Sequence, residues 1–169
     1  MDVINIRRSV RKYAAKPIEK DKIEQLVKAA MQAPSAKNQQ PCSFVVVCNK
    51  ETLQEMSKAS SNIEMLKDAA CSIIVLIDSS KLNMPLMAPQ DAAAATQNIL
   101  LKAVDLKLGS CWCGIYPREE RMKLISKLLN IPKHFLVFSV ISIGYPEDSK
   151  ANYFIDRYDQ NKVYYEKFK

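Results

Sequence analysis

The chain has 169 residues, of which 48% are hydrophobic and 25% are charged, the balance of a globular protein that can bury a core without disulfides or metals. Its longest apolar run, from Ser72 to Ile77, is far shorter than the roughly 18 residues of a membrane span. The net charge of +7 favours anionic ligands, but it is spread along the chain without a helix-turn-helix or an aromatic and basic RNA-binding pattern. We therefore expect one domain over residues 1–169 that binds neither nucleic acid nor membrane.

The N-terminal residues lack the basic and apolar regions of a secretory signal, so we expect a cytoplasmic protein. The five cysteines are odd in number and lie mostly in apolar segments, which predicts reduced, buried thiols. These are Cys42, Cys48, Cys71, Cys111 and Cys113. Cys111 and Cys113 lack the second pair or the histidine that a zinc site needs, so no metal is predicted.

The densest chemical signal lies near the N-terminus, where Arg7, Arg8, Ser9 and Arg11 place three guanidinium groups and a hydroxyl within five residues. Guanidinium groups match phosphate oxygens two at a time, so the cluster predicts a phosphate site. A solvated basic arm is the alternative, because short arginine-rich runs are common on surfaces. With only three glycines and no glycine-rich phosphate motif, any phosphate must be held by side chains, and Arg157 is a distant fourth cation.

The next elements follow in order. Apolar residues at steps of three and four predict an amphipathic helix over 19–33. Pro34 ends this helix and begins a polar loop over 34–41, whose serine and amide side chains either bond their own backbone as turn residues or offer fixed donors and acceptors to a heterocycle. The β-branched run over 43–48 predicts a central strand covered on both faces.

Two helices over 50–60 and 62–70 are predicted before a buried strand over 72–78. The linker over 79–89 is apolar and irregular. The longest helix, over 90–107, has more than one apolar face and is therefore expected to be central.

A short strand is expected over 110–116, and Pro117 then favours the first position of a helix. A third long apolar strand is predicted over 135–143. The only histidine, His134, lies in a loop, and no G-x-S-x-G motif is present, which argues against a Ser-His-Asp hydrolase. The tail over 147–169 is polar and aromatic without a periodic element, which suggests that it lies across another surface such as a partner subunit.

Four segments, taken in order, resemble the nitroreductase family of FMN-dependent oxidoreductases. They are 7–11, 33–41 before a strand, 108–112 after the alanine-rich helix, and 144–146. The resemblance implies an α+β fold with a central mixed, mainly antiparallel sheet flanked by helices. It also implies an obligate homodimer with two FMN molecules at the interface, the long helix in that interface and the C-terminal tail extended over the partner.

For the phosphate end of FMN, the resemblance implies that Arg7, Arg8 and Ser9 hold the phosphate and the ribityl chain. Arg157 in the tail matches a basic position that reaches the phosphate. Arg11 matches the basic residue beside the N1/O2 edge of the flavin. There it would stabilise the negative charge that develops on reduction.

For the flavin ring, the resemblance implies that Ser35 and Asn38 come from the other subunit, with Gln40 as a weaker match. Cys113–Gly114 fall where backbone N–H groups approach N5 and O4, and Asn62 is a further candidate for the pyrimidine edge. The implied reaction is a ping-pong cycle in which NADH or NADPH gives hydride to the flavin N5 and a small acceptor, such as a nitroaromatic or a quinone, then takes it.

No side chain acts as a nucleophile in this cycle, so no catalytic residue is predicted. The alternatives are a flavoprotein of the same fold with other reductive chemistry, such as dehalogenation or flavin fragmentation, and a non-catalytic flavin-binding protein.

Overall fold

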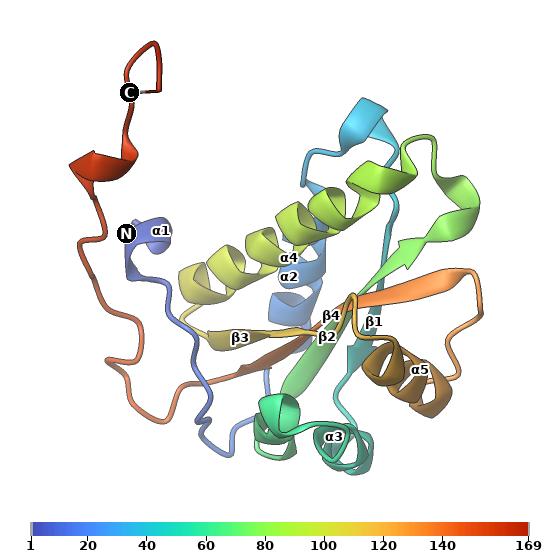
Figure 1. The fold of residues 1–169 in the computed structure, drawn as a ribbon. Helices are drawn as coiled ribbons and strands as arrows, with labels where there is room; N and C mark the ends of the chain where they lie inside the picture. The colour runs from blue at the N-terminus through green and yellow to red at the C-terminus, as the bar shows by residue number, and fades with distance from the viewer. Residues whose placement is uncertain (1, 169) are drawn as a thin grey trace.

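The computed structural model describes residues 2–168 and is built on a four-stranded sheet with the strand order β1-β2-β4-β3 (Figure 1). The strands are β1 (Cys42–Val47), β2 (Cys71–Asp78), β3 (Gly109–Gly114) and β4 (Phe135–Gly144). All three ladders are antiparallel, and an isolated parallel bridge joins Ser9 to Ser110 of β3. The predicted α+β class with a mainly antiparallel sheet is confirmed.

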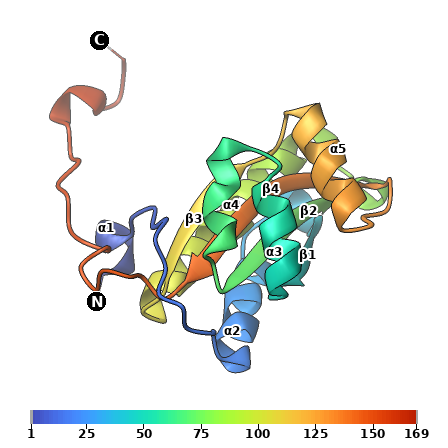
Figure 2. The same cartoon turned by 90° about the horizontal axis from the view of Figure 1, so that it is seen from below.

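Helices cover both faces of this sheet (Figures 1 and 2). One face carries α2 (Lys20–Met31) and α4 (Ala88–Asp105). The other face carries α3 (Lys50–Ser57), the 3₁₀ segment η2 (Ser61–Lys67) and α5 (Glu119–Leu128). The shorter elements are α1 (Val3–Ile6), η1 (Ala36–Asn38), η3 (Ser79–Lys81), η4 (Pro85–Met87) and η5 (Gln160–Lys162). Within residues 2–168, no helix combines the length and the apolar character that crossing a membrane requires.

The central strand β2 shows why the core has two halves. Successive side chains of a strand point to opposite faces, so Ile73 and Val75 pack toward α2 and α4, while Ile74 packs toward α3 and α5. All eight residues of β2 are buried, as its continuous apolar run predicted. The helix α4 buries nine of its residues, which confirms its predicted central position.

The prediction for β1 is half right. Val45 and Phe44 pack into the two different halves of the core, so both faces of β1 are covered. However, β1 is an edge strand of the sheet rather than a central one. A continuous apolar run indicates that both faces of a strand are buried. It does not indicate whether neighbouring strands are hydrogen-bonded to both of its edges.

Other predictions differ in detail from the structure. Pro117 is not the first residue of α5, because Arg118 is its N-cap and the helix begins at Glu119. The predicted helix over 62–70 is the shorter 3₁₀ segment η2, and α1 was not predicted at all.

The tail beyond β4 forms no long element and runs past α1 away from the sheet (Figure 1). Many of its large apolar side chains are exposed, including Phe154 at 62% and Tyr158 at 73%. Because isolated proteins rarely leave so many aromatic side chains in water, this tail has the character of a segment that packs on another surface.

Candidate functional site

The arginine-rich segment is fixed to the sheet by close packing on two glycines. The Val10 N–H donates to the Ser110 carbonyl at 2.9 Å. A Cβ atom on Gly109 would lie 2.7 Å from a Val10 methyl carbon, and one on Gly144 would lie 2.7 Å from the ring of Tyr13. Only glycine allows this approach, so the segment is part of the packed fold and not a solvated arm.

Two ends of the chain meet at Arg7. This side chain is half-buried, and burial together with the charges of Arg8 and Arg157 lowers its pKa. Among residues 2–168, none of the arginines at 7, 8, 11 and 157 forms an ion pair with a carboxylate. Guanidinium groups held together without an acidic partner are a donor set suited to an anion such as phosphate.

Arg8 has a second role that the sequence does not reveal. Its Nη1 donates to the Arg7 carbonyl at 2.5 Å, and its Nη2 donates to the Asn5 carbonyl at 3.1 Å. The guanidinium lies 5.0 Å from the ring centre of Tyr153, and the Arg8 backbone N–H donates to Asn152 Oδ1 at 3.1 Å. Arg8 therefore ties the N-terminus to the tail, while its buried Nε has no hydrogen-bond partner among residues 2–168.

Arg11 and Ser9 lie beside the buried thiols of β3. A hydrogen bond with the Cys113 thiol lowers the pKa of Cys111, and the charge of Arg11, the hydroxyl of Ser9 and the charge of Arg7 lower it further. The structure thus brings three predicted site residues to one thiol, although Arg11 itself is exposed.

The end of β3 is open to solvent at Gly114, where an added Cβ would meet no atom within 4 Å. Arg121 of α5 donates to the Gly114 carbonyl at 3.5 Å. With its amide oxygen toward Arg121, Asn62 accepts from both Nη groups at 3.2 Å. The sequence predicted Gly114 and Asn62 but missed Arg121, which is indistinguishable there from any polar residue of an amphipathic helix.

The loop over 34–41 is strained and internally bonded. Lys37, Asn38 and Gln40 have φ values of 48°, 52° and 45°, a left-handed conformation that is uncommon for residues other than glycine. The Ser35 Oγ accepts from the Gln40 N–H at 2.9 Å. Ser35 therefore acts as a turn residue here, which is one of the two roles expected for this loop.

Two residues that the sequence did not single out hold this loop in place. Gln39 Nε2 donates to Asp91 Oδ2 at 2.6 Å, and the Ala36 N–H donates to Asp91 Oδ1 at 3.0 Å. Gln39 Oε1 accepts from the N–H groups of Asn83 and Met84 at 3.1 and 2.9 Å. In the sequence, Asp91 only indicates the start of a helix, because its loop partners lie about 50 positions earlier.

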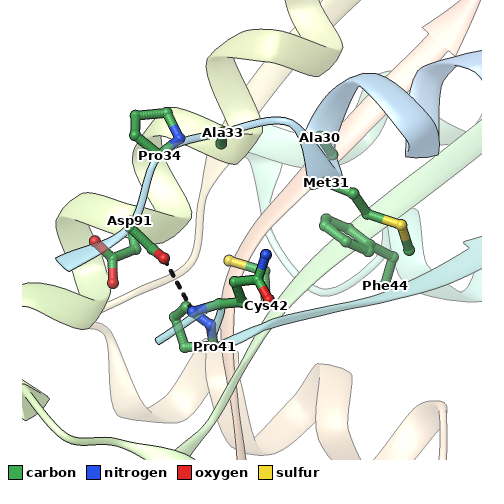
Figure 3. A pocket seen from close by; sticks show the side chains of 10 residues that line it. Ala30, Met31, Ala33, Pro34, Pro41, Cys42, Phe44 and Asp91 are labelled. Atoms are coloured by element: carbon green, nitrogen blue, oxygen red, sulfur yellow. Dashed lines mark hydrogen bonds between the residues drawn. The ribbon is translucent and has the colours of Figure 1, made fainter. Parts of the chain in front are cut away.

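A cavity of about 280 Å³ lies beside the loop. Met31 and Phe44 form one side of it, and Pro34 and Asp91 lie across from them (Figure 3). Burial, with a smaller effect of the Asp91 charge, raises the pKa of Cys42 in this cavity to about 11. The lining of the cavity is therefore mixed, with Met31 and Phe44 as apolar walls and Asp91 and the loop residues as polar groups.

Asp91 holds the loop over 34–41 in place, so we expect its removal to lower the stability of the protein. Asp91→Ala leaves the Ala36 N–H and the Gln39 amide without their buried acceptor, so we expect the free energy of unfolding to fall by roughly 2–3 kcal/mol. Urea unfolding of the protein at a fixed FMN concentration measures this change, because bound ligand shifts apparent stability.

The matched control for this change is Asp105→Ala at the other end of α4. Asp105 pairs with Lys102 at 2.6 Å on the surface, so its loss is expected to cost less than about 1 kcal/mol. Equal unfolding midpoints for the Asp91 and Asp105 variants would show that Asp91 does not anchor the loop.

The predicted site residues form two groups on different elements of one chain. The arginines, Ser9 and Cys113–Gly114 lie along the N-terminal segment, β3 and the tail, whereas Ser35, Asn38 and Gln40 lie on the loop beside the cavity. In the part of the chain that the structure describes, no hydrogen bond joins the two groups.

Together the fold and the site define an α+β protein with a basic, anion-suited cluster and a separate loop-lined cavity. The model of the Nitroreductase family matches residues 4–64 and 58–145. The chain belongs to the nitroreductase family.

Close relatives cover nearly the whole chain. A protein of Archaeoglobus fulgidus, provisionally named as an NADH dehydrogenase/NAD(P)H nitroreductase, is 46% identical over 99% of this chain and 98% of its own length. The structure of an FMN-dependent nitroreductase from Clostridium difficile superposes with a TM-score of 0.89 at 34% identity, covering 98% of each chain. A nitroreductase-like protein of Desulfovibrio desulfuricans, solved in complex with FMN, has a TM-score of 0.82 at 26% identity and covers 99% of this chain and 96% of its own.

Proposed function

We propose that the protein is an FMN-dependent oxidoreductase of a single domain over residues 1–169 that passes hydride from NADH or NADPH to a small acceptor such as a nitroaromatic or a quinone. The observation that carries this proposal is the cluster of Arg7, Arg8 and Arg157, which come from both ends of the chain and form no ion pair with a carboxylate among residues 2–168. Family membership and the FMN-dependent relatives support the same cofactor. The cytoplasmic location remains a prediction.

The residues of the cluster fit the phosphate of FMN. Arg7 and Arg157 offer guanidinium groups that no acidic side chain among residues 2–168 pairs with. Ser9, exposed beside them, has a hydroxyl that can add a short hydrogen bond. Arg8 has fewer free donors than its sequence suggests, because one N–H of each terminal nitrogen is bonded to a backbone carbonyl.

When bound, FMN supplies the hydride chemistry between a nicotinamide and an acceptor. Arg11 would stabilise the negative charge of the reduced ring by preorganised electrostatics, because its position is set by the packed segment that holds Val10 on Gly109. The open backbone at Gly114 would offer its N–H group to the ring, with Arg121 and Asn62 holding that strand end in place.

A homodimer is part of the proposal, because no hydrogen bond within residues 2–168 joins the loop over 34–41 to the arginine cluster of the same chain. Ser35, Asn38 and Gln40 of one subunit would complete the site of the other. The exposed aromatic side chains of the tail provide apolar area for such an interface.

Titration with FMN tests the cofactor. We expect the purified protein to carry a flavin absorbance spectrum or to gain one when FMN is added, with a shifted absorbance band and quenched fluorescence on binding. A colourless protein that takes up no FMN would reject every flavin-based function.

Anaerobic addition of NADH or NADPH then tests the reaction. Bleaching of the bound flavin, followed by recovery when a nitroaromatic or a quinone is added, is the expected result. If FMN binds but neither nicotinamide bleaches it, the protein is a flavin-binding protein and not an NAD(P)H oxidoreductase.

A further inference from the structure

A second pair of cysteines, Cys48 and Cys71, lies at the end of the β1–β2 ladder. The last paired residues of this ladder are Val47 and Ser72, so the next residue of each strand end is a cysteine directly opposite the other. Opposed residues of an antiparallel pair point to the same face, and their Cα atoms lie about 4.5–5.5 Å apart, within the span of about 4.4–6.8 Å that a disulfide bridges. The two thiols are close enough that each shifts the pKa of the other.

The two thiols differ in access and in acidity. Cys71 is fully buried, whereas Cys48 is exposed and borders a cavity of about 230 Å³ that Lys16 and Lys50 also line. The neighbouring Cys71 thiol lowers the pKa of Cys48, while the Cys48 thiol and burial raise the pKa of Cys71. The expectation that the cysteines are buried is thus wrong for Cys48, which follows the edge strand β1 and is exposed.

We propose that Cys48 and Cys71 form a dithiol site that reacts with hydroperoxides and closes into an intramolecular disulfide. Cys48 has the properties of an attacking thiol, since it is accessible and stabilised as a thiolate by its neighbour. Cys71, its buried neighbour, would be the resolving thiol that attacks the oxidised Cys48. This site is separate from the arginine cluster and does not depend on FMN.

The proposed reaction needs only the two thiols and the peroxide. The Cys48 thiolate attacks one peroxide oxygen, the O–O bond breaks, and hydroxide leaves and takes a proton to become water. The Cys71 sulfur then attacks the Cys48 sulfenic acid, the S–O bond breaks, and the hydroxyl leaves as water with the thiol proton of Cys71. Two thiols are oxidised to one disulfide, and one molecule of hydrogen peroxide is reduced to two of water.

Among the other cysteines, Cys111 shares the lowered pKa caused by a neighbouring thiol, but it is buried whereas Cys48 is exposed. The high pKa of Cys42, about 11, keeps its thiol protonated. Cys111 and Cys113 are both buried on one strand, where residues two apart have Cα atoms about 6.5–7 Å apart, at or beyond the limit for a disulfide. We therefore expect peroxide to select the Cys48–Cys71 pair.

Trypsin places Cys48 and Cys71 on different peptides, so a disulfide between them appears as two linked peptides. The peptide 38–50 contains Cys42 and Cys48, the peptide 68–81 contains only Cys71, and the peptide 108–118 contains Cys111 and Cys113. The protein is treated with a small excess of hydrogen peroxide in the absence of NAD(P)H, its free thiols are then alkylated, and the digest is analysed without reduction. We expect the peptide 38–50 to be linked to 68–81 within single chains, while 108–118 is alkylated at both thiols.

Two variants assign the link to one atom pair. Cys42→Ser should retain the linked peptides, and Cys48→Ser, a change at an exposed position, should abolish them with an unchanged circular dichroism spectrum. The proposal is overturned if Cys71 stays fully alkylatable after peroxide treatment, if the link survives in Cys48→Ser, or if Cys111 and Cys113 oxidise first.

Discussion

Replacing Arg7 with alanine is expected to weaken FMN binding by about 1.5–3 kcal/mol, or roughly 10- to 150-fold in the dissociation constant. Arg7 lies where the charges of Arg8 and Arg157 converge, and it has no carboxylate partner among the described residues, so its loss removes charge-assisted hydrogen bonds to the phosphate. Titration of flavin-free protein with FMN, followed by fluorescence quenching, measures the change.

The matched control is Lys12→Ala, which removes one positive charge from the same packed segment without removing a predicted ligand. Its effect on FMN affinity should be small and should vanish in high salt, because a distant exposed charge acts only through the screened field. Arg7→Lys should fall between the two, since an ammonium keeps the charge but loses the paired geometry of the guanidinium. Identical dissociation constants for Arg7→Ala and Lys12→Ala would exclude Arg7 as a specific phosphate ligand.

The double variant Phe154→Ser, Tyr158→Ser is expected to dissociate the proposed homodimer. Each large apolar side chain buried in an interface contributes about 1.5–3 kcal/mol, so losing both should raise the dimer dissociation constant roughly a hundred- to ten-thousand-fold. Both residues are exposed in the single chain, so the change should leave the fold of the subunit intact. Sedimentation velocity over a range of protein concentrations measures the shift.

Leu124→Ser provides a control, because this exposed apolar residue lies on α5, on the face of the sheet opposite α4. It should leave the dimer unchanged. A wild-type protein that sediments as a monomer at micromolar concentration would contradict the homodimer, and a double variant that remains dimeric would show that the tail lies outside the interface.

Loss of the dimer should also weaken FMN binding if the loop of one subunit completes the site of the other. If the dimer and the FMN affinity are lost together, the FMN site is shared between the two subunits. If the affinity is unchanged in the monomer, each chain builds its site alone.

Patterns with a short range along the chain predicted most of the secondary structure. The apolar spacing of α2 and the continuous apolar runs of β2 and β4 indicate which residues of these elements are buried. These elements and the α+β class therefore follow from the sequence. The strand β1 shows the limit, because the same kind of run occurs at the edge of the sheet. The choice between edge and centre depends on strand order, which no local pattern encodes.

The functional residues divide in the same way. The arginine-rich segment is visible in the sequence because its residues are adjacent, and its resemblance to the nitroreductase family placed Arg157 beside it. Asp91, Gln39 and Arg121 carry no such signal, since each acts through a partner far along the chain.

By itself, the sequence determined the chemical composition of the site: guanidinium groups with no glycine-rich alternative, in a chain of the nitroreductase family. Only the tertiary structure decided how these groups are used. It packed the arginine segment onto Gly109 and Gly144, engaged Arg8 with backbone carbonyls, and set Cys48 opposite Cys71. The physical reason is that residue types fix which bonds a side chain can form, whereas the register of strands and the packing of distant segments fix which partners it meets.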